Sequence, residues 1–254
     1  MAYQTLILEK RDALATITLN RPQVLNAIST TVLKEIQRAL GSLEGSPGVK
    51  VVLFRGAGDR AFSAGTDIKE VAGLFAKGRG SVLTKYLSAT FGVVRRFPKP
   101  VVCAVHGYCL GAAVELMLSC DIVIAREDAQ FGMPEIDRGI PSIVEAAILA
   151  RAMSILRAKE LVMTGDFWSA QRAERYGLVN EVVPRDKFEG RVAEVVNKLA
   201  AKDALALAVQ KDICNKWLTT DLETAIEYSR MALLRTQGTA GQVQGMRSFV
   251  EKKR

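Results

Sequence analysis

Twice in this chain an apolar, strand-like run leads through a few small residues into the start of a helix. The first junction is residues 62–67, Phe-Ser-Ala-Gly-Thr-Asp, and the second is residues 107–115, Gly-Tyr-Cys-Leu-Gly-Ala-Ala-Val-Glu. Such a junction leaves backbone N–H groups outside the hydrogen bonds of strand and helix, and two of these groups that converge form an oxyanion hole. The sequence therefore predicts a backbone anion receptor at the ends of two strands.

Strand and helix patterns alternate along the first half of the chain. Apolar alternation predicts a hairpin from residues 5–8 and 14–19, and helical spacing behind Ser29 predicts a helix over residues 30–43. We expect further strands at residues 49–54, 101–105 and 122–125, and helices at residues 67–74, 81–97 and 111–119. From about residue 142 the pattern is mostly helical, with a strand-like return at residues 177–183 and one break at residues 238–241. This order indicates an α/β layered or spiral fold.

Two glutamates lie where they could serve acid/base chemistry beside the predicted oxyanion hole. Glu115 stands in the first turn of an apolar helix, and Glu135 follows twenty residues later. A partly buried carboxyl group titrates nearer neutrality, which suits a general acid or base. The competing interpretation is structural: Glu115 would cap its helix, and Glu135 would pair with Arg138 on the surface. Their common place beside the oxyanion elements favours the catalytic interpretation.

Composition narrows the class of protein. A single histidine, His106, leaves little room for a Ser-His or Cys-His triad or for a zinc site, and we interpret it as a buried residue at a strand end. The four cysteines lack Cys-x-x-Cys spacing and are expected to be reduced core residues, so no metal is predicted. No apolar run is long enough to span a membrane and no leader pattern is seen at Met1, so we expect a cytoplasmic protein.

The formal charge of +8 calls for an acidic partner, either phosphate on a small cofactor or nucleic acid. The basic residues are spread along the chain without interleaved aromatic residues, so no nucleic-acid partner is expected. Residues 56–61, Gly-Ala-Gly-Asp-Arg-Ala, superficially fit a dinucleotide fingerprint. A second loop follows them instead of a helix, and a tight turn explains these glycines better.

Five segments, taken together and in order, resemble the enoyl-CoA hydratase/isomerase (crotonase) family almost end to end. They are residues 19–27, 62–70, 99–121, 129–135 and 245–252. The resemblance implies a spiral of ββα units over residues 1–191 that holds an acyl-CoA site, and a helical trimerisation region over residues 192–254. It also implies reversible addition of water to a 2-enoyl-CoA, with coenzyme A as part of the substrate and no permanently bound cofactor. The partner copies would form a homotrimer or a hexamer.

By position in the family's motifs, the oxyanion donors are the backbone N–H groups of Thr66 and Ala112. Glu115 would be the base that activates water, and Glu135 the acid that protonates the α carbon. Thr66 and Ala112 depart from the alanine and glycine that are usual in relatives. Both changes bear on the shape of the acyl group more than on the donors themselves, since the donors are backbone groups.

The resemblance also implies the walls of the substrate site. The CoA-binding residues would be Leu25, Ala27, Ala64, Asp67, Ile68, Lys69, Phe249 and Lys252, and Met133, Ile140, Ile143 and Val144 would line the acyl pocket. The sharpest departure is residues 142–145, Ser-Ile-Val-Glu, which replace a glycine-rich turn that helps hold water in relatives. Glu145 is thus either a third carboxylate near the pocket or a first-turn helix residue.

Two other functions stay open from the sequence. A double-bond isomerase of acyl-CoA can operate with one carboxylate near Glu135, and the presence of Glu115 favours hydration over it. An RNA-binding member of the same fold is the non-catalytic alternative that the basic charge suggests.

Overall fold

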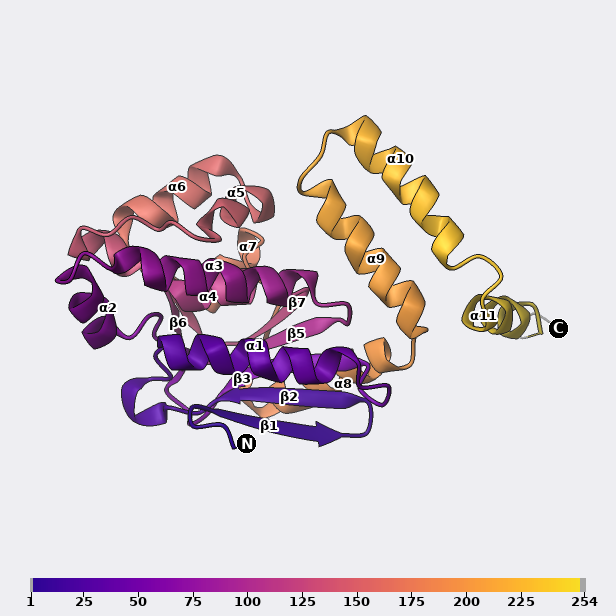
Figure 1. Cartoon of the computed structure of the whole chain (residues 1–254), viewed down its shortest axis with the longest axis horizontal. Coiled ribbons are helices and arrows are strands. Elements are labelled where there is room, and N and C mark those ends of the chain that lie inside the picture. Colours follow the sequence, from indigo (N-terminus) through magenta and orange to yellow (C-terminus); the bar gives the residue numbers. More distant parts are fainter. Residues whose placement is uncertain (1, 252–254) are drawn as a thin grey trace.

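Two β-sheets form the centre of the molecule in the computed structural model, which describes residues 2–251 (Figure 1). The larger sheet has the strand order β1-β2-β3-β5-β7-β10, and all neighbouring pairs are parallel except β1 with β2. The smaller sheet has the order β4-β6-β8-β9, with β9 antiparallel to β8. The strands of the larger sheet are β1 (Leu6–Arg11), β2 (Leu14–Leu19), β3 (Val51–Gly56), β5 (Val101–Val105), β7 (Ile122–Arg126) and β10 (Glu181–Val183). Those of the smaller sheet are β4 (Ala61–Ser63), β6 (Tyr108–Leu110), β8 (Gln130–Gly132) and β9 (Trp168–Ser169).

The chain passes from one sheet to the other in a repeating order. β3, β5 and β7 lie side by side in the larger sheet, and each is followed directly by a short strand of the smaller sheet, β4, β6 or β8. Helices follow each of these strand pairs. Each repeat therefore adds one strand to each sheet, and the predicted α/β spiral of ββα units is confirmed.

Eleven α-helices are found among the described residues. Those of the layered part are α1 (Thr30–Glu44), α2 (Ile68–Phe75), α3 (Gly80–Arg96), α4 (Ala112–Leu118), α5 (Leu149–Ala152), α6 (Ile155–Thr164), α7 (Ala170–Arg175) and α8 (Phe188–Ala200). The C-terminal helices are α9 (Ala204–Trp217), α10 (Leu222–Ala232) and α11 (Ala240–Glu251). Short 3-10 turns include η1 (Pro22–Val24), η2 (Pro134–Arg138), η3 (Ala146–Ile148), η4 (Arg185–Lys187) and η5 (Leu233–Arg235). Ser29 caps α1 as expected, because its side chain accepts a hydrogen bond from the Val32 N–H.

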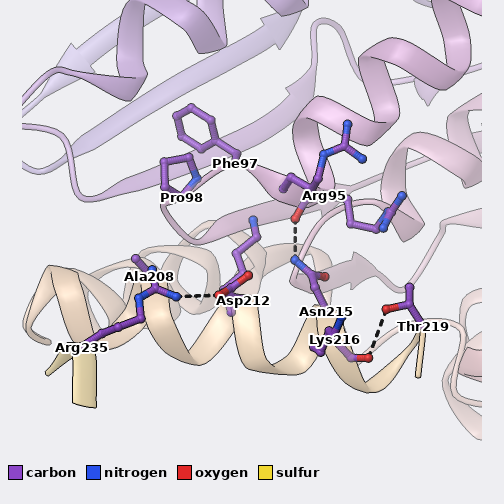
Figure 2. Close-up of a pocket in the computed structure, with 11 residues that line it drawn as sticks. Arg95, Phe97, Pro98, Ala208, Asp212, Asn215, Lys216, Thr219 and Arg235 are labelled. Carbon is purple, nitrogen blue, oxygen red and sulfur yellow. Dashed lines mark hydrogen bonds and ion pairs between the residues drawn. The ribbon is translucent and has the colours of Figure 1, made fainter. Parts of the chain in front are cut away.

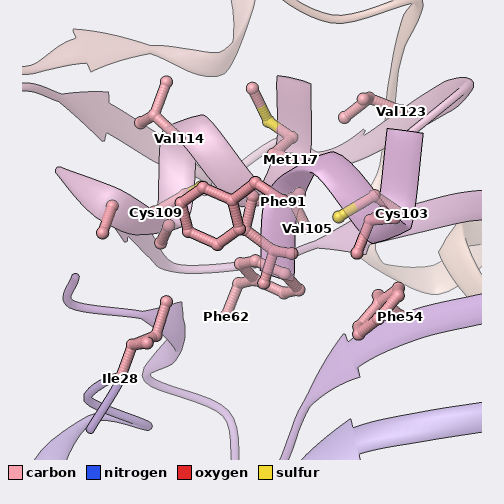
Figure 3. Close-up of a cluster of buried hydrophobic side chains, with 14 of the residues drawn as sticks. Ile28, Phe54, Phe62, Phe91, Cys103, Val105, Cys109, Val114, Met117 and Val123 are labelled. Atoms are coloured by element: carbon pink, nitrogen blue, oxygen red, sulfur yellow. The ribbon is translucent and has the colours of Figure 1, made fainter. Parts of the chain in front are cut away.

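The main core lies between the sheets and the helices α1, α3 and α4, and aromatic rings fill its centre (Figure 3). Phe54, Phe62 and Phe91 are fully buried there. Cys103 and Cys109 belong to the same cluster, and Cys120 packs half-buried against it, as expected for core residues. Cys214 is exposed, so the expectation that all four cysteines are core residues was wrong for this one. A smaller cluster packs α8 against the other face of the larger sheet. These packed layers hold the strand ends of both sheets in fixed positions.

The C-terminal helices leave this layered part. α9 and α10 pack against each other, and α11 lies farthest from the sheets (Figure 1). The division of the chain at residues 191 and 192 stays a proposal: α8 spans that position and is packed on the larger sheet through Phe188, Val192 and Val196. Within residues 2–251, no helix combines the length and the apolar character needed to cross a lipid bilayer.

The short strands of the smaller sheet were not expected from the sequence. β4, β6, β8 and β9 have two or three residues each, too few for an alternating pattern to show. The sequence also predicted only one break in the helical tail, near residues 238–241. The helical tail is interrupted earlier as well, and Asp203 and Asp221 cap the helices that begin after those interruptions.

Candidate active site

The two strand-to-helix junctions meet at one edge of the smaller sheet. β4 and β6 are parallel neighbours there, so the residues that follow them leave the sheet at the same edge. Gly65 has φ +88°, and a Cβ atom at this position would lie 2.6 Å from the Leu110 carbonyl oxygen and 3.5 Å from the Ala112 nitrogen. The two backbones are thus in direct contact, and only glycine allows both the approach and the conformation.

The backbone donors expected at this junction are free. The Gly65 carbonyl accepts from the Ile28 N–H at 2.7 Å, and the Asp67 N–H donates to Ile28 at 2.9 Å, which fixes the chain on both sides of Thr66. Within residues 2–251 the Thr66 N–H donates to no loop or side-chain acceptor, and the Ala112 N–H opens α4, where it has no intrahelical partner. The helix dipole of α4 adds partial positive charge at the same point.

Glu115 lies in the first turn of α4 and is 4% exposed. Its Oε1 accepts hydrogen bonds from the Val144 N–H at 3.2 Å and the Ala146 N–H at 3.1 Å. Its Oε2 accepts no hydrogen bond from a described residue. Burial raises the pKa of Glu115 to about 7, and the nearby negative charges of Glu135 and Glu145 also raise it. The hydrogen bonds from the two backbone amides lower this pKa and offset part of the effect. A carboxyl group with these properties can exchange protons at neutral pH.

Glu135 lies in η2 and packs against the backbone at the start of α4. A Cβ atom on Gly111 would lie 2.6 Å from Glu135 Oε1, so the glycine makes room for this carboxyl group. Glu135 Oε2 is buried and has no hydrogen-bond partner within residues 2–251. Burial raises the pKa of Glu135, and the positive charge of Arg138 lowers it by less than burial raises it. Arg138 donates instead to the Pro134 carbonyl, so the expected alternative of a surface ion pair is not what the structure contains.

The segment of residues 142–146, which we call the Glu115 loop, lies over the first carboxyl group. Its backbone supplies both hydrogen bonds to Glu115. The side chain of Glu145 forms an ion pair with Arg95 of α3, with 3.6 Å between Oε2 and Nε. Arg95 was not predicted as a site residue, because fifty residues separate it from Glu145 and no motif surrounds it.

The predicted CoA-binding residues near the N-terminus come together. The Ala64 N–H donates to the Leu25 carbonyl at 2.9 Å, and Arg21 forms an ion pair with Asp67 at 2.9 Å. Arg21 also donates to the Ala27 carbonyl at 2.7 Å. Two further predicted residues, Ile68 and Lys69, stand exposed in the first turn of α2.

This arrangement requires an unusual turn. Leu25 and Asn26 have φ +51° and +55°, a conformation that residues other than glycine adopt rarely. The side chain of Asn26 holds it in place, since it is 2% exposed and donates to the Ala57 and Ala61 carbonyls at 2.9 Å each. Of the predicted tail residues, Phe249 lies on α11, far from this turn, and Lys252 falls outside the described residues (Figure 1).

The four predicted acyl-pocket residues differ in exposure. Met133 is fully buried in the core, Ile140 and Val144 are half-buried against it, and Ile143 is 55% exposed. A cavity of about 500 Å³ lies elsewhere, between the end of α3 and α9 (Figure 2). Basic side chains from both helices line it. The acyl pocket therefore stays a prediction.

Metal and histidine chemistry receive no support from the described residues. No group of three or more His, Cys, Asp or Glu side chains within residues 2–251 could hold a metal ion. His106 is buried at the end of β5, and burial lowers its pKa.

Comparison with known proteins places this geometry in a family. The family model described as enoyl-CoA hydratase/isomerase matches residues 9–254. The "Probable enoyl-CoA hydratase echA8" of Mycobacterium tuberculosis is 35% identical, with 100% of this chain and 97% of that protein covered. The "Short-chain-enoyl-CoA hydratase" of Clostridium acetobutylicum is 34% identical with the same coverage. The crystal structure of an enoyl-CoA hydratase from Bacillus anthracis matches with a TM-score of 0.92 at 32% identity, covering 98% of this chain and 97% of that one. The chain belongs to the enoyl-CoA hydratase/isomerase (crotonase) family of acyl-CoA enzymes.

Proposed function

We propose that this protein is an enoyl-CoA hydratase, which adds water reversibly to a 2-enoyl-CoA to give a 3-hydroxyacyl-CoA. One observation carries the proposal: the buried Glu115 and the half-buried Glu135, both with raised pKa, flank the N-terminus of α4. Beside them lie the Thr66 and Ala112 N–H groups, which have no acceptor among the loops and side chains of residues 2–251. An isomerase needs to move a proton between carbons and can use one carboxyl group. A second carboxyl group, placed to accept a proton, supports the activation of water.

The reaction follows from where charge develops. When the oxygen of water bonds to the β carbon, the electrons of the double bond move to the thioester oxygen. The N–H groups of Thr66 and Ala112 would bind this enolate oxygen, and such donors typically contribute about 3–4 kcal/mol each in a water-excluded site. The ionised Glu115 takes a proton from the attacking water, and the protonated Glu135 gives one to the α carbon. A proton then returns from Glu115 to Glu135, directly or through solvent, and the cycle closes.

The environment of each carboxyl group suits its proposed role. The two backbone donors hold Oε1 of Glu115 and leave Oε2 for water. Glu135 has a buried oxygen without a partner, which favours the neutral, proton-carrying form of the acid. A base that is ionised and an acid that is protonated near neutral pH are what hydration requires.

We propose that coenzyme A lies along the turn of residues 25–27 and the segment of residues 64–69. The contacts that join these segments support a common wall, and Lys69 is exposed where it can meet a phosphate. Thr66 and Ala112 make the oxyanion region more crowded than in relatives. Together with the similarity to the short-chain-enoyl-CoA hydratase of Clostridium acetobutylicum, this supports a short acyl chain, with Met133, Ile140, Ile143 and Val144 around it.

We further propose that residues 192–254 join copies of the chain into a homotrimer or a hexamer. The C-terminal helices carry apolar side chains that this single chain leaves exposed, among them Ile226, Met246 and Val250. Exposed large apolar side chains concentrated on a few helices are typical of protein interfaces. An interface would also allow Phe249 of one copy to reach the CoA site of another, since α11, which carries it, lies far from the turn of residues 25–27 in its own chain (Figure 1).

The test is a spectrophotometric screen of 2-enoyl-CoA thioesters that follows the loss of the conjugated absorbance. We expect turnover with short-chain substrates, and a decrease of roughly a hundredfold or more in Glu115→Gln and in Glu135→Gln. Glu9→Gln, on the exposed side of β1, is the matched control and should behave as the wild type. Normal turnover in both site variants would refute the proposal, and conversion of 3-enoyl-CoA without hydration would favour an isomerase.

A further inference from the structure

The Glu115 loop contacts two parts of the protein through one residue. The amides of Val144 and Ala146, on either side of Glu145, both donate to Oε1 of Glu115. The carboxylate of Glu145 itself lies 3.6 Å from Nε of Arg95, near the end of α3. The residue between the two donors is therefore fixed by its side chain to a long helix of the core.

The ion pair is sheltered from solvent. The side chain of Glu145 is 11% exposed and that of Arg95 is 24% exposed, so water screens their attraction less than it would at the surface. Nε of Arg95 is buried and has no hydrogen-bond partner within residues 2–251. The nearby carboxylate thus compensates a guanidinium group that would otherwise be poorly solvated.

Arg95 is held independently of the Glu115 loop. Its carbonyl accepts a hydrogen bond from Asn215 Nδ2 of α9 at 3.0 Å. Figure 2 shows this carbonyl turned toward α9 and the guanidinium group on the other side. The arginine consequently forms a fixed point between the C-terminal helices and the loop.

The loop has few other contacts: Val144 packs half-buried against the core, and the Glu145 carbonyl accepts a hydrogen bond from the Ile148 N–H at 2.9 Å. Residues 140–145 have no helix or strand, and η3 begins only at Ala146. Residues 142–145, Ser-Ile-Val-Glu, stand where the family resemblance implies a glycine-rich turn, and Glu145 adds a charged side chain there. The charged groups that face Glu115 are Glu135 and Glu145, and Arg95 in turn faces Glu145.

We propose that Arg95 is a positioning residue of the hydration reaction: it anchors Glu145 and thereby holds the Val144 and Ala146 amides against Glu115, so that the second oxygen of Glu115 is aimed at water. The inference rests on the proposed function for its effect on turnover. It predicts that Arg95 changes kcat rather than KM, because it is remote from the CoA wall. It also predicts an electrostatic signature, since the charge of Glu145 raises the pKa of Glu115 and Arg95 forms an ion pair with Glu145.

The test compares Arg95→Met, Arg95→Lys and Glu145→Gln, with Arg96→Met as the control for loss of one positive charge at the neighbouring, exposed position. Arg95→Met and Glu145→Gln should each lower kcat by roughly tenfold with KM nearly unchanged, a size typical of a small displacement of a catalytic group. Arg95→Lys keeps the charge and should recover most of the loss. Arg96→Met should leave kcat as it is.

The pKa of Glu115 separates positioning from a general loss of structure. Removal of the negative charge in Glu145→Gln should lower this pKa, and removal of the positive charge in Arg95→Met should raise it. Titration of the carboxyl by infrared spectroscopy, identified by the band missing in Glu115→Gln, measures both shifts without substrate. An absence of hydratase activity in the wild type would refute the proposed function and leave this titration intact. Shifts of the same sign in both variants, no shifts, or no recovery in Arg95→Lys would overturn the role of Arg95.

Discussion

Replacement of Glu115 by glutamine should make the protein more stable at alkaline pH while it lowers turnover. A carboxyl group that titrates at about 7 in the fold and near its ordinary 4.5 in the unfolded chain binds its proton more tightly when folded. A tenfold difference in proton affinity corresponds to about 1.4 kcal/mol, so ionised Glu115 destabilises the folded state by about 3 kcal/mol once both states have lost the proton. Glutamine avoids this charge, and its Oε1 can still accept from the Val144 and Ala146 amides.

The sign of the pH dependence follows from the raised pKa. Below pH 4.5 both states carry the proton and Glu115 favours neither. Between pH 4.5 and about 7 the unfolded chain loses its proton first, so the stability of the wild type falls across this window relative to Glu115→Gln and levels off above it. The free energy of unfolding of Glu115→Gln should thus exceed that of the wild type by about 1 kcal/mol at pH 5 and by about 3 kcal/mol at pH 8.5.

Urea unfolding at these two pH values measures the gap, at one protein concentration so that any subunit association contributes equally. Glu9→Gln on the exposed side of β1 is the control and should show no such dependence. A gap that is the same at both pH values, or one that favours the wild type at pH 8.5, would contradict a buried carboxyl group with a raised pKa.

Three further outcomes follow from the site. The kcat/KM of the wild type should fall as pH drops through about 7, because Glu115 then carries a proton, and a pH profile flat from 5.5 to 8.5 would count against its role as base. Gly111→Ala should lower turnover, since the added Cβ would meet Glu135 Oε1 at 2.6 Å with φ at +54°; wild-type kinetics in this variant would show that Glu135 lies elsewhere. Asn26→Ala should raise KM for the CoA thioester and reduce the stability by roughly 2–4 kcal/mol in thermal or urea unfolding, because it leaves buried carbonyls without donors. An unchanged KM in Asn26→Ala would separate this turn from CoA binding.

Local patterns predicted most of the elements of the larger sheet and its helices. Strand β5 and the second strand of the hairpin were predicted with the bounds they have, and α1 to within one residue, since each shows clear apolar spacing. The smaller sheet could not be predicted in this way. Its strands are two or three residues long, and they form because the packed spiral brings them together.

The candidate site was predictable to the extent that its residues lie in local motifs. Thr66, Ala112 and Glu115 lie in the two junctions of residues 62–67 and 107–115, and Glu135 directly follows residues 131–134, Phe-Gly-Met-Pro, so the local sequence marks each of them. The partners of these residues come from tertiary structure. The Val144 and Ala146 amides, and Arg95 behind them, reach Glu115 from segments about twenty to thirty residues away, and no spacing rule connects such segments.

The proposed mechanism requires that two backbone amides hold a thioester carbonyl while Glu115 takes a proton from water and Glu135 gives one to the α carbon. A crystal structure of the protein with an unreactive acyl-CoA analogue tests it most directly. We expect the thioester oxygen at hydrogen-bond distance, about 2.7–3.1 Å, from the nitrogens of both Thr66 and Ala112, with the β carbon facing Glu115 and the α carbon facing Glu135. A thioester oxygen bound away from these two nitrogens would contradict the account.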